Sequence, residues 1–294
     1  MKKPFRQDDS LLAEIHSTSA VNDPTARLWW LGQSGFLLQY RARHLVFDPY
    51  LSDSLTRKYA DTAKPHVRIS ERVVAPEALD FVDVVTSTHN HTDHLDAETL
   101  VPLIRAKQGR HERLFAWSTT DGMTPPLILP AANVTFAQQR LSGSTPVYEG
   151  LCAWETYDAR PFEITAVPAA HDQLTLDDLG RNVYVGFVVK AGTTVIYHSG
   201  DTVVYDGMAD DLRPFNIDVA LLPINGKVGN MSARDAARLA KDIGAKLVIP
   251  CHYDMFEFNT ADPADEFVPE CEHLGQPYRV LQQGERWSSD ELAT

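Results

Sequence analysis

Three histidines and one aspartate lie within six residues of this chain, at His89, His91, Asp93 and His94. They directly follow the apolar run 81–85, which has the composition of a buried strand. Neutral imidazole and carboxylate are the usual protein ligands of zinc, manganese and iron. The cluster therefore predicts a divalent metal site at the C-terminal end of a strand.

Three other stretches repeat this pattern, in which an apolar strand ends at a ligand-type residue. The strands and the residues that follow them are 164–168 with His171, 194–197 with His198 and Asp201, and 247–250 with His252. In layered α/β folds, sites form where strands end, so these residues are expected at one edge of a sheet. Leaving out His198, these stretches supply seven candidate ligands. Seven ligands exceed what one tetrahedral ion takes and suit two ions that share a bridging carboxylate and a bridging water.

The seven ligands divide between two divalent ions. We assign His89, His91 and His171 to the first ion, assign Asp93, His94 and His252 to the second, and make Asp201 the bridge. Asp93 and Asp201 are also the predicted catalytic residues, with Asp93 as a proton shuttle. Manganese or zinc is expected in both positions, with iron as a further candidate.

Other polar residues have a weaker signal. Asp48 either orients a metal-binding histidine or simply forms an Asp-Pro turn, and both readings stay open. His198 is a candidate for supporting the ligands from behind. Cys251 is expected to be a buried structural thiol, because strand alternation points it away from His252. The candidates for substrate binding are Lys227, Asn230 and Tyr253.

These residues need strands and helices to position them. A hairpin is expected from strands 27–31 and 35–40 around the turn 32–34. Further strands are expected at 44–47, 114–117, 151–156, 162–167, 183–190, 193–197, 218–222 and 246–250. Helices are expected at 95–105 and 232–243, and in the C-terminal part. Ser232 would cap the second helix, with Asp235 three residues on, and Gly244 would close it.

Length and composition set the outer limits. The 294 residues fit one α/β domain over 1–294, with a short polar N-terminal arm at 1–24. The net charge of −13 argues against nucleic acid, which leaves a small-molecule substrate. No apolar run approaches the roughly 18 residues of a membrane span. Three cysteines without a paired motif indicate a reducing compartment, so the cytoplasm is expected, and a homo-oligomer is a reasonable expectation.

Other chemistries lack their motifs. The stretch 32–36 is similar to the nucleophile elbow of serine hydrolases but does not have the final glycine. There is neither a dinucleotide-binding glycine motif after a strand nor a phosphate-binding loop with its lysine. Metal-assisted hydrolysis is therefore the favoured reaction class.

The whole pattern resembles the metallo-β-lactamase superfamily. The resemblance rests on segments 29–32, 47–49, 88–94 and 200–202 and on the late His252. It implies an α/β fold arranged as a four-layer αββα sandwich, with a dinuclear site at one edge of the two sheets.

Within that superfamily the chain looks most like the L-ascorbate-6-phosphate lactonase (UlaG-like) group. Segments 29–32, 197–201, 217–221, 248–254 and 262–263 are similar to it. The resemblance implies a manganese-dependent enzyme in which a metal-bridged hydroxide opens a sugar-acid phosphate lactone.

Three alternatives stay open. A phosphodiesterase or phospholipase-D-like enzyme would use the same ligands to attack phosphorus. An iron-dependent oxygenase on the same scaffold would be iron-filled and oxygen-sensitive. A non-catalytic binding module would have no need of the complete ligand set that this chain retains.

Overall fold

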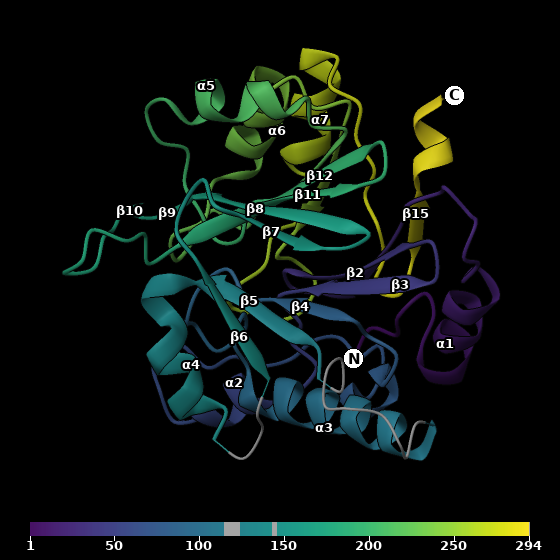
Figure 1. The fold of residues 1–294 in the computed structure, drawn as a ribbon. Coiled ribbons are helices and arrows are strands. Elements are labelled where there is room, and N and C mark those ends of the chain that lie inside the picture. The colour runs from purple at the N-terminus through teal and green to yellow at the C-terminus, as the bar shows by residue number, and fades with distance from the viewer. Residues whose placement is uncertain (115–123, 143–145, 294) are drawn as a thin grey trace.

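The computed structural model describes residues 1–114, 124–142 and 146–293. Two β-sheets pack face to face between two layers of helices, which is the αββα sandwich expected from the sequence (Figure 1). The first sheet has the order β15 (Arg286–Ser288), β1 (Arg27–Gly32), β2 (Gly35–Tyr40), β3 (Arg43–Phe47), β4 (Val84–Thr86), β5 (Pro126–Pro130) and β6 (Val147–Leu151). The second has the order β14 (Leu247–Cys251), β13 (Val219–Pro223), β12 (Thr194–His198), β11 (Val185–Ala191), β8 (Phe162–Pro168) and β7 (Thr156–Ala159).

Helices cover the outer face of each sheet. Figure 1 places α2 (Ser54–Lys58), α3 (Ala97–Leu114) and α4 (Val134–Arg140) on the side of the first sheet. It places α5 (Met208–Leu212), α6 (Ala233–Asp242) and α7 (Phe267–Leu274) over the second. Short 3-10 turns lie at 76–79, 131–133, 213–215 and 289–293. A small two-stranded piece, β9 (Ala170–His171) with β10 (Gln173–Leu174), stands at the edge of the sandwich.

Both sheets are mixed. Strands β1, β2 and β3 pair antiparallel, whereas β3, β4, β5 and β6 run parallel to one another. In the second sheet β7, β8, β11 and β12 are antiparallel, and β12, β13 and β14 are parallel. Parallel strands end at the same edge of a sheet, so the loops after β4, β12 and β14 can converge on one site.

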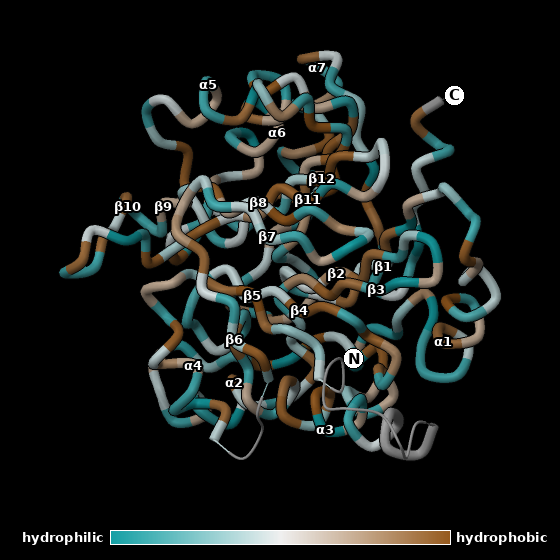
Figure 2. Tube along the Cα trace, viewed as in Figure 1, coloured by the Kyte–Doolittle hydropathy of each residue, from teal (hydrophilic) through white to brown (hydrophobic). Residues whose placement is uncertain are grey.

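Successive residues of a strand point to opposite faces, so the first sheet contributes to two hydrophobic cores. In β1, Leu28 and Trp30 join the core between the sheets, and Trp29 and Leu31 join the core beneath the helices. Both faces of β1 are buried from Leu28 to Leu31, and these residues carry no charge. Figure 2 shows further hydrophobic stretches where the two sheets meet. This double burial makes the first sheet a rigid base for the loop that follows β4.

The N-terminal interval 1–24, expected as an arm, contains helix α1 (Asp8–Ser17). Its Leu11 and Ile15 are fully buried in the core beneath the first sheet. Trp29 Nε1 donates to Glu14 Oε2 at 2.9 Å, so the helix is fastened to β1. Among the described residues, no helix has the length and apolar character needed to cross a bilayer.

Most expected elements are present, and α6 shows the predicted ends. The amide of Asp235 donates to Ser232 Oγ at 3.2 Å, which confirms the N-cap. Gly244 has a φ of +72° just after the helix, in the conformation that glycine favours at this position. The hairpin of β1 and β2 around residues 32–34 is also confirmed.

Three expectations differ from the structure. The interval 151–156 is the connection between β6 and β7, because Glu155 N donates to Cys152 O at 3.1 Å and closes a turn there. The expected helix 95–105 continues to Leu114, so the expected strand 114–117 starts inside α3 and otherwise lies outside the described residues. Strands β5 and β15 were not expected, since their short proline-bounded or C-terminal sequences have no alternating pattern. The short strands β6, β7, β9 and β10 were not expected either, and β7 occupies a segment that was expected to be a turn.

Candidate metal centre

The loop after β4 is held rigidly by its backbone. The amide of Leu95 donates to the carbonyl oxygen of His91 at 2.9 Å and closes a tight turn. Arg140 Nη1 in α4 donates to Asn90 O at 2.6 Å and to Leu95 O at 3.3 Å. On the other side, Val185 N of the second sheet donates to Thr88 O at 3.1 Å. The loop is therefore fastened from both halves of the sandwich.

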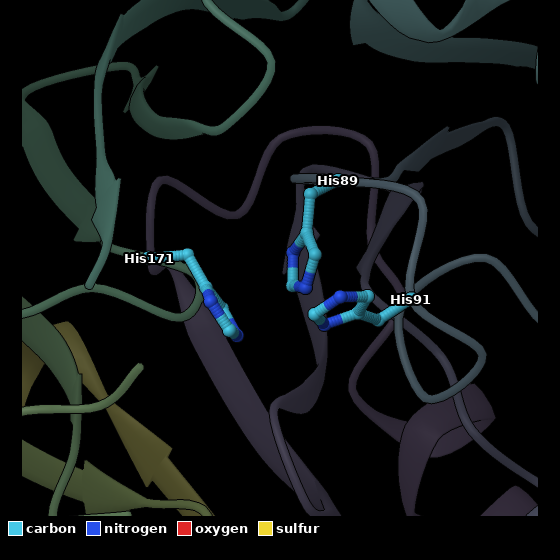
Figure 3. A group of neighbouring side chains, drawn as sticks. All are labelled: His89, His91 and His171. Atoms are coloured by element: carbon cyan, nitrogen blue, oxygen red, sulfur yellow. The ribbon is translucent and has the colours of Figure 1, made fainter. Parts of the chain in front are cut away.

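Three histidines form the first group of converging side chains. Figure 3 shows the rings of His89, His91 and His171 turned toward one another, two from the loop after β4 and one from β9. One nitrogen of each lies within 4.8 Å of the other two. We call these residues the three-histidine locus.

Two histidines and two aspartates form the second group, which we call the carboxylate locus. His94 Nε2 lies 3.2 Å from Asp201 Oδ1 and 3.8 Å from Asp93 Oδ2. His252 Nε2 lies 3.5 Å from the same Asp201 atom and 3.6 Å from the same Asp93 atom. Atoms about 2.1 Å from a tetrahedral ion lie about 3.4 Å from one another, so these four atoms have the spacing of a ligand cage.

Unpartnered buried atoms provide an independent test of metal binding. Among the described residues, four such atoms without a hydrogen-bond partner lie in these two loci: Nε2 of His89, His94 and His171 and Oδ1 of Asp201. Buried polar atoms are nearly always hydrogen-bonded, so four orphans in one place indicate a missing partner. A divalent cation satisfies imidazole nitrogen and carboxylate oxygen together, and the residues fit it. His89, His94 and Asp201 also converge as a group, which lies between the two loci.

The two loci differ in their protonation. Burial lowers the pKa of His94 and His252, but Asp201 and Asp93 outweigh burial. The net effect raises the pKa of His94 well above its ordinary value and that of His252 to about 9. Burial alone would raise the pKa of Asp201, yet His94 and His252 hold it well below the usual range. In the three-histidine locus, burial lowers the pKa of His89 and His91, so both rings are neutral and ready to bind an ion.

Asp48 takes the orienting position behind the carboxylate locus. Its Oδ2 accepts a hydrogen bond from His94 Nδ1 at 2.5 Å, and its Oδ1 accepts one from Thr88 N at 2.9 Å. Such a contact fixes the ring so that Nε2 faces the other ligands. Gly200 lets the loop before Asp201 approach closely, because a Cβ there would lie 2.6 Å from Thr88 Cβ.

His198 lies behind the site and outside the groups of converging ligand atoms. Its ring stacks on Phe47 at 5.0 Å between centroids, and its Nε2 lies 2.8 Å from Ser34 O. It therefore supports the turn between β1 and β2. Cys251 is buried as expected, and burial raises the pKa of its thiol.

The candidates for substrate binding are placed differently from one another. Lys227 is exposed, and its Nζ donates to Phe258 O at 3.1 Å. Asn230 is buried, and both polar atoms of its side chain lack a partner among the described residues. The adjoining Gly229 approaches His171 so closely that a Cβ would lie 2.4 Å from its Nδ1. Tyr253 lies in the core, where its hydroxyl donates to Leu281 O, and it does not line the cavity at the metal cluster.

Two residues near the ligands had no signal in the sequence. Gln33 is buried in the turn between β1 and β2, and its Nε2 lies 3.0 Å both from Asp93 Oδ2 and from His252 Nε2. Tyr184 stacks on His171 with a centroid distance of 5.1 Å. A glutamine in a hairpin turn and a tyrosine before a strand are commonplace, so only the tertiary structure reveals their place.

A cavity of about 420 Å³ opens onto the cluster. His91, Asp93 and Asp201 line its floor, and residues of α2, of the segment after α2 and of α4 line its walls. The ligand atoms are therefore reached from solvent through a space of the size of a small molecule.

The comparisons with known proteins agree with this geometry. Residues 27–252 match the family described as the beta-lactamase superfamily domain. A UPF0173 metal-dependent hydrolase of Opitutus terrae is 30% identical over 260 residues, which is 88% of this chain and 98% of that protein. A second one, from Methanopyrus kandleri, is 28% identical and covers 87% of this chain and 95% of its own length.

Solved structures share the fold. The metallo hydrolase Igni18 of Ignicoccus hospitalis has a TM-score of 0.60 at 22% identity, covering 90% of this chain and 98% of that one. A possible metal-dependent hydrolase of Veillonella parvula has a TM-score of 0.67 at 14% identity, covering 90% and 99%. From its sequence match, its fold and its cluster of metal-binding side chains, the chain belongs to the metallo-β-lactamase superfamily, within the UPF0173 family of metal-dependent hydrolases.

Proposed function

We propose that this hydrolase is a lactonase that opens a sugar-acid phosphate lactone such as L-ascorbate 6-phosphate. The observation that carries the hydrolytic site is the set of four contacts, each 3.2–3.8 Å long, that join His94 and His252 to Asp93 and Asp201 at the floor of a solvent-reached cavity. The lactone is supported by the similarity of segments 197–201 and 248–254 to the lactonase group.

The chain's own residues would divide the work. When divalent ions are bound, they supply a hydroxide at neutral pH and a positive charge for the carbonyl oxygen. Asp201 belongs to the carboxylate locus, also converges with His89 of the three-histidine locus, and would hold both together. Gln33 Nε2 donates to Asp93 Oδ2 at 3.0 Å and would hold this carboxylate in place. The Asp93 carboxylate would carry the proton from the attacking water to the ring oxygen that departs when the lactone C–O bond breaks.

The test is hydrolysis of L-ascorbate 6-phosphate by the purified protein, with added manganese and with a chelator. The proposal predicts manganese-dependent turnover that the chelator abolishes and that His91→Ala removes. His273→Ala serves as the matched control, because His273 is an exposed histidine on α7 away from both loci. Full activity in His91→Ala would contradict the mechanism.

The same assay decides among the alternatives. Turnover of a phosphodiester but of no lactone would favour the phosphodiesterase or phospholipase-D-like reading. Iron in the isolated protein together with oxygen-dependent chemistry would favour an oxygenase. A similar fold occurs in CmlA of Streptomyces venezuelae, which is described as a diiron β-hydroxylase. An isothiocyanate belongs in the substrate panel, because an isothiocyanate hydrolase from Delia radicum gut bacteria also shares the fold.

We also propose that the protein works in the cytoplasm on a small molecule. Cys152, Cys251 and Cys271 are all free thiols, which supports a reducing compartment. The charge of −13 supports a partner other than nucleic acid. A homo-oligomer stays a prediction, which light scattering on the purified chain would check.

A further inference from the structure

We propose that Lys58 and Lys64 form an anion-binding subsite in the wall of the catalytic cavity. The substrate would then carry a phosphate or carboxylate group beside the bond that is cleaved. This inference deepens the proposed function and relies on it only for the identity of the cavity as the substrate site.

Lys58 stands next to the ligand loop. It is the last residue of α2, and its Nζ donates to Thr92 Oγ1 at 3.2 Å. Thr92 directly precedes Asp93, which belongs to the carboxylate locus. The ammonium group therefore lies at the boundary between the metal cluster and the open cavity, where it can reach a group attached close to the reacting carbonyl.

Lys64 stands on an aromatic part of the same wall. Its Nζ lies 5.8 Å from the centre of the Phe258 ring. Next to it, His66 stacks on Tyr59 at 4.6 Å and meets Phe258 edge-on at 5.7 Å. These rings give the wall a rigid, largely apolar surface from which the ammonium group projects.

Neither lysine has a carboxylate to neutralise it. Among the residues that the structure describes, no ion pair within 4.0 Å involves Lys58 or Lys64, whereas neighbouring cations are paired. Arg57 pairs with Glu98, and Arg68 pairs with Asp53 at 2.9 Å. In the stretch 57–68, the two arginines are therefore neutralised by carboxylates, whereas the two lysines that line the cavity are available to bind an anionic ligand.

The opposite wall adds a third positive charge. Arg140 of α4 lines the cavity, and its hydrogen bonds to Asn90 and Leu95 leave it without a carboxylate partner in the described part of the chain. Asp93 and Asp201 are the only carboxylates in the described lining, and both lie in the ligand cluster. Once ions engage these two, the cavity carries a net positive charge inside a protein of charge −13. Such a local reversal of sign concentrates anions against the general field.

The test measures binding and needs no turnover. Phenylphosphonate is titrated calorimetrically into the manganese-loaded protein and into Lys58→Gln, Lys64→Gln and the double variant. The double variant should bind it about tenfold more weakly, because two charge-assisted contacts are lost. Lys241→Gln is the matched control, since Lys241 lies on α6, does not line the cavity, and donates from its Nζ to Gly275 O. Equal affinity in the double variant and the unchanged protein would overturn the proposal.

Two further arms separate the possible outcomes. Benzoate replaces phenylphosphonate to distinguish a carboxylate from a phosphate site, and the metal content of each variant is measured to exclude loss of ions. If phenylphosphonate binding depends on the lysines while no lactone is hydrolysed, the anion subsite stands and the lactonase proposal falls. If lactones are hydrolysed with a KM that does not change in the double variant, the lactonase stands and the anion subsite falls.

Discussion

The two loci of the metal cluster lie side by side but are built differently. The carboxylate locus brings two aspartates together with His94 and His252. Two of the four residues follow β4 of the first sheet, and the other two follow β12 and β14 of the second sheet. The three-histidine locus has only imidazole groups and no carboxylate of its own, two from the loop after β4 and one from β9. An ion in the first is largely neutralised by its ligands, whereas an ion in the second depends on a shared carboxylate.

The two loci also differ in the residues that hold their histidine rings in place. His94 is fully buried and oriented by Asp48, which is itself fully buried. His171 stacks on Tyr184, and its Nδ1 lies 3.7 Å from the exposed Asp172. Among the described residues, no buried carboxylate orients its ring. Orienting partners raise the metal affinity of a histidine, so the carboxylate locus should hold its ion more tightly than the three-histidine locus.

The largest effect is expected from Asp201→Ala. Asp201 belongs to the carboxylate locus and also groups with His89 and His94, so its loss should weaken both positions. We expect metal content to fall toward zero and kcat/KM to fall by at least about a thousandfold. Elemental analysis and the lactonase assay check this. A variant that kept one tightly bound ion per chain would show that Asp201 does not link the two loci.

A selective effect is expected from His171→Ala. The substitution removes one of three ligands from the three-histidine locus and leaves the carboxylate locus complete. The protein should lose about one equivalent of metal and retain the other. Calorimetric titration of the metal-free protein with manganese measures both equivalents. Loss of both would mean that the two positions fill only together.

Asp48→Asn should act on the carboxylate locus without removing a ligand. The amide cannot accept the same charge-assisted hydrogen bond from His94 Nδ1, so the ring is held less firmly. We expect metal affinity at that locus to fall about 10- to 100-fold, with little change at the other. Unchanged affinities at both positions would reduce Asp48 to a turn residue.

The smallest effect concerns protons. In the metal-free protein at pH 7, His94 and His252 carry protons because their pKa values are raised, that of His252 to about 9. Ion binding must expel these protons, so affinity at the carboxylate locus should rise as the pH approaches 9. His89 and His91 have lowered pKa values and release none at pH 7. Calorimetry in buffers of different ionisation enthalpy counts the protons, and release at both loci would contradict the distinction.

The convergence of the candidate ligands was predictable because the signals for them are local. The cluster 89–94 has a spacing that no ordinary core requires, and His171, Asp201 and His252 each follow an apolar strand. The αββα architecture was expected from the resemblance to the metallo-β-lactamase superfamily. Their meeting in space follows from parallel strands that end at one edge.

What lies around the ligands was less predictable. Gln33, Tyr184 and Lys58 reach the site through turns and tertiary packing, and nothing in their local sequence distinguishes them from surface residues. Tyr253 was singled out because it lies beside a loop near the presumed site, yet its hydroxyl donates to Leu281 O in the core. The backbone at His252 has a φ of +63°, a bend that the sequence does not predict, so adjacency to a ligand does not predict a place in the cavity.

The most direct test of two distinct loci is anomalous X-ray scattering from crystals of the manganese-loaded protein. We expect one peak at the carboxylate locus, among His94, His252, Asp93 and Asp201. We expect a second peak at the three-histidine locus. The occupancy of the second should fall first when a chelator is added. A loaded crystal with no peak at the carboxylate locus, or with an ion held by other residues, would contradict the assignment of these two loci as metal sites.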